Sequence, residues 1–226
     1  MYRVNEIFYS LQGEGFWTGT PMVFVRLSGC NLQCPFCDTD HRGFREMSAE
    51  EIVAEVWRID KEANAQNPVW SSCGRVCITG GEPSLQLDYD LIEALHRYGY
   101  TIHLETNGTR PLPEMIDWVT LSPKVDVPGL KGDGTVVLEQ ANELKLVYDG
   151  SLSEERLCYW EAFPAGWHFL QPCDTGDPER TREMIRQTVN FILSHGGTWR
   201  LSLQTHKLLD IRLYMGDSLH KNGPKC

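Results

Sequence analysis

Three closely spaced cysteines are the residues of this sequence with the clearest chemistry. Cys30, Cys34 and Cys37 lie within eight residues, directly after an apolar segment typical of a strand. Three thiolates can bind three irons of one cubane, whereas four cysteines would saturate a [4Fe–4S] cluster. The fourth iron then stays open to a substrate or a cofactor. The spacing therefore predicts a [4Fe–4S] cluster that takes part in enzyme chemistry.

A structural zinc site is the alternative for these cysteines. Together with His41 they would supply a Cys₃His set, which zinc accepts. Zinc fingers usually pair their cysteines and then leave a long gap, whereas these three are separated by three and then two residues. The pattern favours the cluster and leaves zinc open. We interpret the remaining cysteines as small apolar side chains in a reducing compartment, at Cys73, Cys77, Cys158, Cys173 and Cys226.

Short sequence motifs that contain polar residues or glycine follow several predicted strands. Residues 79–83 read Thr-Gly-Gly-Glu-Pro, where the paired glycines let the backbone approach a ligand and Glu82 can pair with an ammonium group. Alone, this word is as typical of a tight turn. Residues 122–124 (Ser-Pro-Lys) and 171–174 (Gln-Pro-Cys-Asp) end two further strands. In parallel sheets the chemistry lies at the carboxyl ends of strands, which is where these words fall.

Strand-like and helix-like segments alternate along the chain and have to position these residues. Strands are expected at 21–28, 75–79, 101–106, 118–121, 143–148, 167–170 and 199–204. Helices are expected after Ser48, which forms a capping box with Glu51, over 89–98, and over 178–194 behind the cap Asp177. The alternation predicts an α/β fold with a parallel sheet. About six such strands would form an open, partial barrel instead of a closed eight-stranded one.

Composition narrows the class of protein. The formal charge of −10, from 21 basic and 31 acidic residues, argues against the basic surface of a nucleic-acid-binding protein. The first fifteen residues contain neither a basic leader nor a long apolar run, so we expect no signal peptide, no membrane anchor and a cytoplasmic location. We expect one domain over 1–212 and a polar extension with Gly and Pro over 213–226.

The C-x₃-C-x₂-C motif after a first long strand resembles that of the radical S-adenosylmethionine (SAM) enzymes. The resemblance implies that SAM chelates the open iron through its amino and carboxylate groups. It also implies that one electron from the reduced cluster breaks the sulfonium bond, and that a 5′-deoxyadenosyl radical then takes hydrogen from the substrate. The protein would supply binding, orientation and protection of these species.

Several words together resemble one family in that superfamily, 7-carboxy-7-deazaguanine synthase. They are 11–15 (LQGEG), Arg26, 37–39 (CDT), 79–83 (TGGEP), 104–108 (LETNG), 122–124 (SPK) and 203–207 (LQTHK). The resemblance implies a modified, partial (β/α)6-type barrel, a homodimer and an external one-electron reductant such as a flavodoxin. It implies that 6-carboxy-5,6,7,8-tetrahydropterin is converted to 7-carboxy-7-deazaguanine with loss of ammonia, on the route to queuosine and other 7-deazapurines.

The resemblance also assigns roles to residues, and it requires no catalytic side chain because the chemistry is radical-based. The substrate would contact Leu11, Gln12, Gly13, Arg26 and Thr79. Thr39 would bind Mg²⁺, which otherwise keeps water and substrate oxygens. SAM would lie among Phe36, Cys37, Asp38, Gly81, Glu82, Ser122, Pro123, Lys124, Gln171, Pro172, Cys173 and Asp174.

Two other functions are weighed against this one. A small activase that places a glycyl radical on a partner protein would share the cysteine motif, but the LQGEG, CDT and QTHK words argue against it. A zinc-stabilised binding module would share only the cysteines. The roles of Glu105 and His206, and of Cys73 and Cys77, are left open by the sequence.

Overall fold

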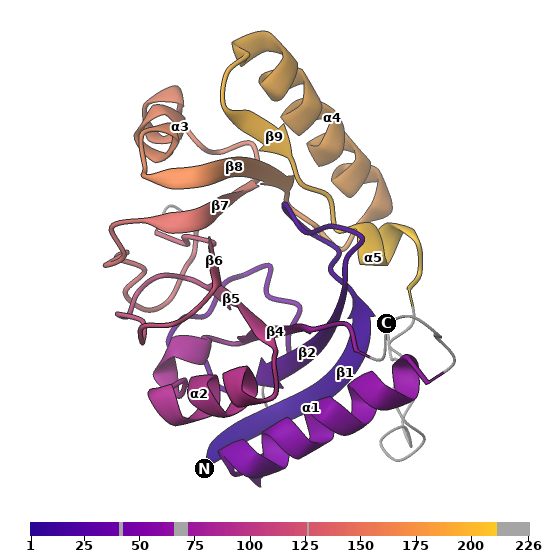
Figure 1. Cartoon of the computed structure of the whole chain (residues 1–226). Coiled ribbons are helices and arrows are strands. Elements are labelled where there is room, and N and C mark those ends of the chain that lie inside the picture. The colour runs from indigo at the N-terminus through magenta and orange to yellow at the C-terminus, as the bar shows by residue number, and fades with distance from the viewer. Residues whose placement is uncertain (41–42, 66–71, 126, 212–226) are drawn as a thin grey trace.

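The computed structural model describes residues 1–40, 43–65, 72–125 and 127–211, so the predicted extension over 213–226 and the alternative ligand His41 lie outside the described residues. The described chain folds around one sheet, with strand order β3-β1-β2-β4-β5-β6-β7-β8-β9 (Figure 1). The strands are β1 (Tyr2–Leu11), β2 (Pro21–Leu27), β3 (Arg45–Met47), β4 (Arg75–Gly80), β5 (Thr101–Thr106), β6 (Trp118–Leu121), β7 (Ala141–Tyr148), β8 (Ala165–Pro172) and β9 (Trp199–Leu201). The helices are α1 (Ala49–Ala63), the 3₁₀ turn η1 (Pro83–Leu85), α2 (Tyr89–Arg97), α3 (Glu154–Glu161), α4 (Pro178–His195) and α5 (Thr205–Leu208).

The topology confirms the predicted parallel α/β sheet. β2 and every strand from β4 to β9 run parallel, whereas β1 is antiparallel to both β2 and β3. In the described chain the sheet ends on β3 at one side and β9 at the other, so the barrel is open, as expected. The predicted number of strands was too low, because β1 and β3 were missed. β1 buries residues on both faces and contains a register shift between Val4 and Glu6, so its sequence lacks a simple alternation.

Side-chain caps set the starts of the main helices. Ser48 and Glu51 form the predicted capping box of α1, and Asp177 caps α4 with Pro178 in the first turn. Helix α3 was missed, because it buries only Leu157 and Trp160 and has a weak apolar face. Within the described residues, no helix combines the length and the apolar character that a bilayer crossing requires.

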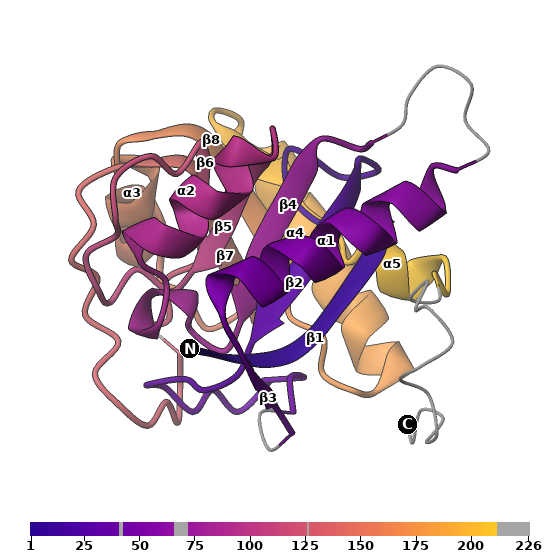
Figure 2. The same ribbon diagram turned by 60° about the horizontal axis from the view of Figure 1, so that its bottom comes forward.

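The sheet has an apolar outer face and a mixed inner face, where polar residues lie beside a small apolar cluster that includes Phe8 and Phe24. Helices α1 and α2 cover β1, β2, β4 and β5 from outside (Figure 2), where Val76, Ile78, Ile102 and Leu104 belong to one buried cluster. A second buried cluster under α3 and α4 contains residues such as Leu144 of β7. Because strand side chains alternate between faces, the residues between these apolar ones point to the inside of the partial barrel.

The turns that follow the parallel strands all lie at the same end of the sheet. Cys30 follows β2, and the Gly80-Gly81 pair ends β4. Ser122 follows β6, and the predicted 171–174 word closes β8. The parallel arrangement therefore brings motifs that are far apart in the sequence together at the carboxyl end of the sheet, as expected.

Candidate active site

The carboxyl ends of the parallel strands surround a cavity of about 350 Å³. All predicted cluster, magnesium and substrate residues line it, which are Cys30, Cys34, Cys37, Thr39, Leu11, Gln12, Gly13, Arg26 and Thr79. Most predicted SAM contacts line it as well, namely Phe36, Asp38, Gly81, Ser122, Lys124, Gln171, Pro172, Cys173 and Asp174. The tertiary structure thus brings these residues together, and their individual roles stay predictions.

The three cysteines of the motif open onto this cavity. Cys30 and Cys34 are half-buried, and Cys37 is exposed. Burial raises the pKa of both Cys30 and Cys34, and the nearby ammonium of Lys124 opposes that rise. Within the described residues, no three His, Cys, Asp or Glu side chains gather around a single point as one metal ion requires. A cubane binds each thiolate through a different iron, so the three thiols fit a cluster without such a gathering.

Glu82 lies in the turn after β4, where its side chain is enclosed by protein. Its carboxylate is fully buried and does not line the cavity. It accepts hydrogen bonds from Thr106 Oγ1 at 2.7 Å, from the backbone N of Asn107 at 2.7 Å and from that of Ser84 at 3.0 Å. The contact of Glu82 with an ammonium group stays a prediction. In the described chain its oxygens join the turn after β4 to the end of β5 and the turn after it.

Pro123 follows β6, as expected, but does not line the main cavity. It lies between Ser122 and Lys124, which both face the main cavity, and it borders a smaller neighbouring cavity together with Phe36. Lys124 Nζ donates to Ser122 Oγ and to the Ser122 carbonyl, both at 2.6 Å. Burial lowers the pKa of Lys124, and the Cys34 thiol beside it opposes the shift. The turn after β6 thus places the half-buried Lys124 near Cys34.

Lys207 connects two acidic residues of the cavity wall. Its Nζ lies 2.8 Å from Asp38 Oδ2 and 2.8 Å from Asp174 Oδ2. The hydrogen bond from Lys207 lowers the pKa of Asp174. Asp38 follows the cysteine motif and Asp174 follows β8, so Lys207 of α5 ties together two segments that were both predicted to contact SAM.

Arg26 is fixed on the opposite wall. Its Nε donates to Glu6 Oε1 at 2.7 Å, and its guanidinium carbon lies 5.7 Å from the centre of the Phe8 ring. Phe8 stacks on Phe24 of the neighbouring strand with ring centres 5.1 Å apart. The planar guanidinium is therefore held against an aromatic pair, with Glu6 as its acidic partner.

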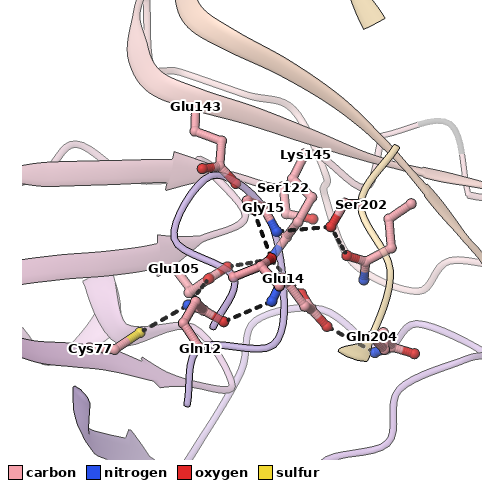
Figure 3. Close-up of polar contacts among 12 residues, drawn as sticks. Gln12, Glu14, Gly15, Cys77, Glu105, Ser122, Glu143, Lys145, Ser202 and Gln204 are labelled. Carbon is pink, nitrogen blue, oxygen red and sulfur yellow. Dashed lines mark hydrogen bonds and ion pairs between the residues drawn. The ribbon is translucent and has the colours of Figure 1, made fainter. Parts of the chain in front are cut away.

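A buried ion-pair network at the floor of the cavity was not predicted (Figure 3). Lys145 of β7 is 4% exposed, and its Nζ lies 2.5 Å from Glu14 Oε2 and 2.8 Å from Glu105 Oε2. Gln12 donates to Glu105 Oε1 at 3.2 Å, and Gln204 donates to Glu14 Oε1 at 3.0 Å. The network joins the loop after β1, the ends of β5 and β7, and the chain after β9.

The charges of this network stabilise one another. Burial alone would raise the pKa of Glu14, but Lys145 outweighs it and lowers that pKa to about 2. Burial opposes the charge on Lys145, and Glu105 and Glu14 nevertheless raise the pKa of Lys145 well above its usual range. A signal for this site was present in the sequence, because Glu143 and Lys145 alternate with leucines in an otherwise apolar strand.

His206, whose role the sequence left open, packs against the loop after β1. A Cβ atom added to Gly13 would lie 2.0 Å from His206 Nδ1, and the backbone N of Thr205 donates to the Gly13 carbonyl at 2.9 Å. Burial lowers the pKa of His206. Gly13 is thus required by the close approach of the chain after β9. Of the cysteines left open, Cys77 lines the cavity, whereas Cys73 does not.

Comparison with known proteins agrees with this geometry. A sequence profile of the Radical SAM superfamily matches residues 24–123, which include the three cysteines. The 7-carboxy-7-deazaguanine synthase of Bacteroides thetaiotaomicron is 47% identical over 212 residues, covering 94% of this chain and 100% of that protein. The enzyme of the same name from Burkholderia multivorans is 38% identical over 227 residues, covering 93% and 99%. The chain belongs to the 7-carboxy-7-deazaguanine synthase family.

Solved structures place the family on the same fold. QueE from Escherichia coli matches with a TM-score of 0.70 and 29% identity, covering 91% of this chain and 94% of that one. Streptococcus suis SuiB, at 16% identity and a TM-score of 0.50, covers 78% of this chain and 47% of that one, and shows a likeness of fold alone. Membership in the 7-carboxy-7-deazaguanine synthase family makes the protein a radical SAM enzyme, which implies a [4Fe–4S] cluster and SAM as cofactors.

Replacing Lys145 with Met should lower the free energy of unfolding by about 3 kcal/mol near neutral pH, because two partly buried carboxylates lose their buried counter-ion. The folded-state pKa of Glu14 is about 2, below its ordinary 4.5, so the part of this contribution that comes from Glu14 is present above pH 4.5 and is lost as the pH falls toward 2. Urea unfolding of both proteins across this range measures the difference. The exposed Lys131→Met should stay within about 0.5 kcal/mol, and a Lys145→Met deficit independent of pH would contradict the assignment.

Proposed function

We propose that this cavity is where the chain converts 6-carboxy-5,6,7,8-tetrahydropterin to 7-carboxy-7-deazaguanine with loss of ammonia. The observation that carries the proposal is that one cavity gathers the three motif cysteines with Gln12, Arg26 and Thr79. A radical generated at the cysteines would therefore form beside the substrate. The ring-contraction chemistry itself belongs to the cofactors, and the protein supplies binding and orientation.

The cofactor side of the cavity is formed by the turns after β2, β4, β6 and β8. Cys30, Cys34 and Cys37 would hold the cluster, and when bound the cluster and SAM would supply the radical that abstracts hydrogen from C6 of the pterin. Gly81 lines the cavity, and a side chain there would collide with the Gly29 carbonyl, so only glycine fits between the cysteine loop and a ligand. Lys124 would contribute positive charge beside Cys34.

The substrate side is formed by β1, β2 and the end of β4. Arg26, held by Glu6, would meet the pterin carboxylate, because a fixed guanidinium fork matches a planar anion. Thr39 lies on the same cavity after the cysteine motif and would offer its oxygen to Mg²⁺, which would orient the substrate carboxylate and stabilise charge during ring contraction. No side chain is required as nucleophile or general base.

The proposal extends to the setting of the enzyme. On the basis of the motifs shared with the family, we propose a homodimer, an external one-electron reductant such as a flavodoxin and a cytoplasmic location. The alternative hypothesis, a glycyl-radical activase, predicts a different outcome for the purified protein, because an activase would modify a partner protein and leave the pterin unchanged.

Reconstituted and reduced enzyme, given SAM and the carboxytetrahydropterin under anaerobic conditions, should release 7-carboxy-7-deazaguanine, measured by chromatography and mass spectrometry. The protein should be brown, with about four irons per chain. Colourless protein with one zinc would support the binding module. If the brown enzyme cleaves SAM but forms no 7-carboxy-7-deazaguanine, the proposed synthase activity is wrong. The protein would then be a radical SAM enzyme of another activity.

Cys34→Ala should abolish both the cluster absorbance and product formation, because one of three iron ligands is lost. The exposed thiol of Cys158 lies on α3, away from the cavity lining, and makes Cys158→Ala the matched control. Iron analysis and turnover are measured on both variants. Full iron content and turnover in Cys34→Ala would contradict the assignment of the cluster.

Thr39→Ala should mainly change the dependence of turnover on Mg²⁺, because the missing oxygen is one metal ligand among several. We expect the Mg²⁺ concentration for half-maximal turnover to rise about tenfold, with iron content unchanged. Thr135→Ala, at an exposed threonine outside the cavity lining, is the control. An unchanged Mg²⁺ dependence in Thr39→Ala would remove Thr39 from the metal site.

A further inference from the structure

The loop between β1 and β2 reaches across the open side of the barrel. Its Gly13 carbonyl accepts a hydrogen bond from Thr205 N at 2.9 Å, and its Gly15 N donates to Ser202 Oγ at 2.9 Å. Thr205 and Ser202 both follow β9, at the far end of the sheet order from β1. The loop therefore closes the barrel with single hydrogen bonds, where strand pairing does not.

Glu143 of β7 holds the middle of this loop. Its Oε2 accepts a hydrogen bond from the backbone N of Phe16 at 3.0 Å, and its side chain points to Gly15 in Figure 3. A Cβ atom added to Gly15, whose φ is +64°, would lie 1.9 Å from Glu143 Oε1. The carboxylate thus fills the space beside this glycine. Gly15 also donates to Ser202, so the loop is held from both β7 and the chain after β9.

We propose that Glu143 is a positioning residue for the reaction, whose carboxylate fixes the Gly15–Phe16 backbone and thereby seats Gln12 and Glu14 at the cavity wall. Glu143 does not line the cavity itself, so it would act only through the loop. The proposal rests on the proposed function, because it assumes that Gln12 and its neighbours contact the pterin.

The Glu143 carboxyl group is buried among other charged groups and is kept there as a hydrogen-bond acceptor. Lys145 lies two residues along the same strand, Glu105 approaches from β5 and Glu14 from the loop. Burial raises the pKa of Glu143 to about 7, and Lys145 opposes the rise. An apolar side chain would fill the same space without that cost, but would leave the Phe16 N–H without its acceptor. Both the neutral and the charged carboxyl group can accept that hydrogen bond, and so can a glutamine amide oxygen.

The test compares Glu143→Ala with Glu143→Gln and measures the loop without turnover. Hydrogen exchange of the protein should show amides 13–16 exchanging about tenfold faster in Glu143→Ala, because the acceptor for Phe16 is gone. Glu143→Gln should stay within about threefold of the parent protein. Glu139→Ala, at the exposed residue just before β7, is the control and should match the parent.

The second measurement is steady-state turnover of the carboxytetrahydropterin. Glu143→Ala should raise the KM for the pterin about tenfold with kcat within about threefold, and Glu143→Gln should restore the KM. A role in stability alone would lower the fraction of active enzyme and leave KM unchanged, which would overturn the proposal. Unchanged exchange of residues 13–16 in Glu143→Ala would overturn it as well.

Gly15→Ala provides an independent variant, because its added methyl group would displace the loop from the other side of the same contact. It should reproduce the faster exchange and the higher KM of Glu143→Ala, and normal KM in Gly15→Ala would contradict the proposal. If the parent enzyme does not form 7-carboxy-7-deazaguanine, the proposed function is contradicted instead. The exchange measurement does not depend on the product, so the two failures are distinguishable.

Discussion

The rest of the structure depends on one constraint, which is that an open parallel sheet must be closed over a reactive centre without strand pairing between its ends. The buried Lys145 ammonium meets this constraint, because it binds Glu14 from the loop after β1 and Glu105 from the end of β5. A buried charge is stable only when its partners stay in place. The ion pairs therefore fix the loop, the middle strands and, through Gln204, the chain after β9 in one arrangement.

The two faces of the sheet divide stability and chemistry between them. The outer face forms the apolar clusters under α1, α2, α3 and α4, which are the main source of folding energy. The inner face carries polar and charged residues that such a core would otherwise exclude. Glu82 belongs to the supporting structure, because its buried carboxylate connects the turns after β4 and β5. The backbone N of Glu82 also donates to the Gly29 carbonyl at 2.9 Å, which attaches the start of the cysteine loop to this turn.

In a radical SAM enzyme the cofactors perform the difficult bond breaking, so the protein contributes mainly by position. The cavity fits that division of labour. The pKa values of Glu14 and Lys145 in its lining are shifted by their pairing with one another, which suits these groups to holding a shape. The glycines of the LQGEG word follow from the same need, because Gly13 meets His206 and Gly15 meets Glu143 at distances that exclude a side chain.

The sequence by itself determined the parallel α/β class, the main helix caps and the family, and it predicts the cluster cysteines, because these depend on local spacing and on short motifs. It did not reveal β1, β3 or α3, whose patterns are weak, or that the Glu82 carboxylate is fully buried between two turns. The tertiary structure alone decided that Glu14, Glu105 and Lys145 form one network, because these residues are separated by up to 131 positions. Local patterns state which side chains a segment presents, and only the packed sheet decides which of them meet.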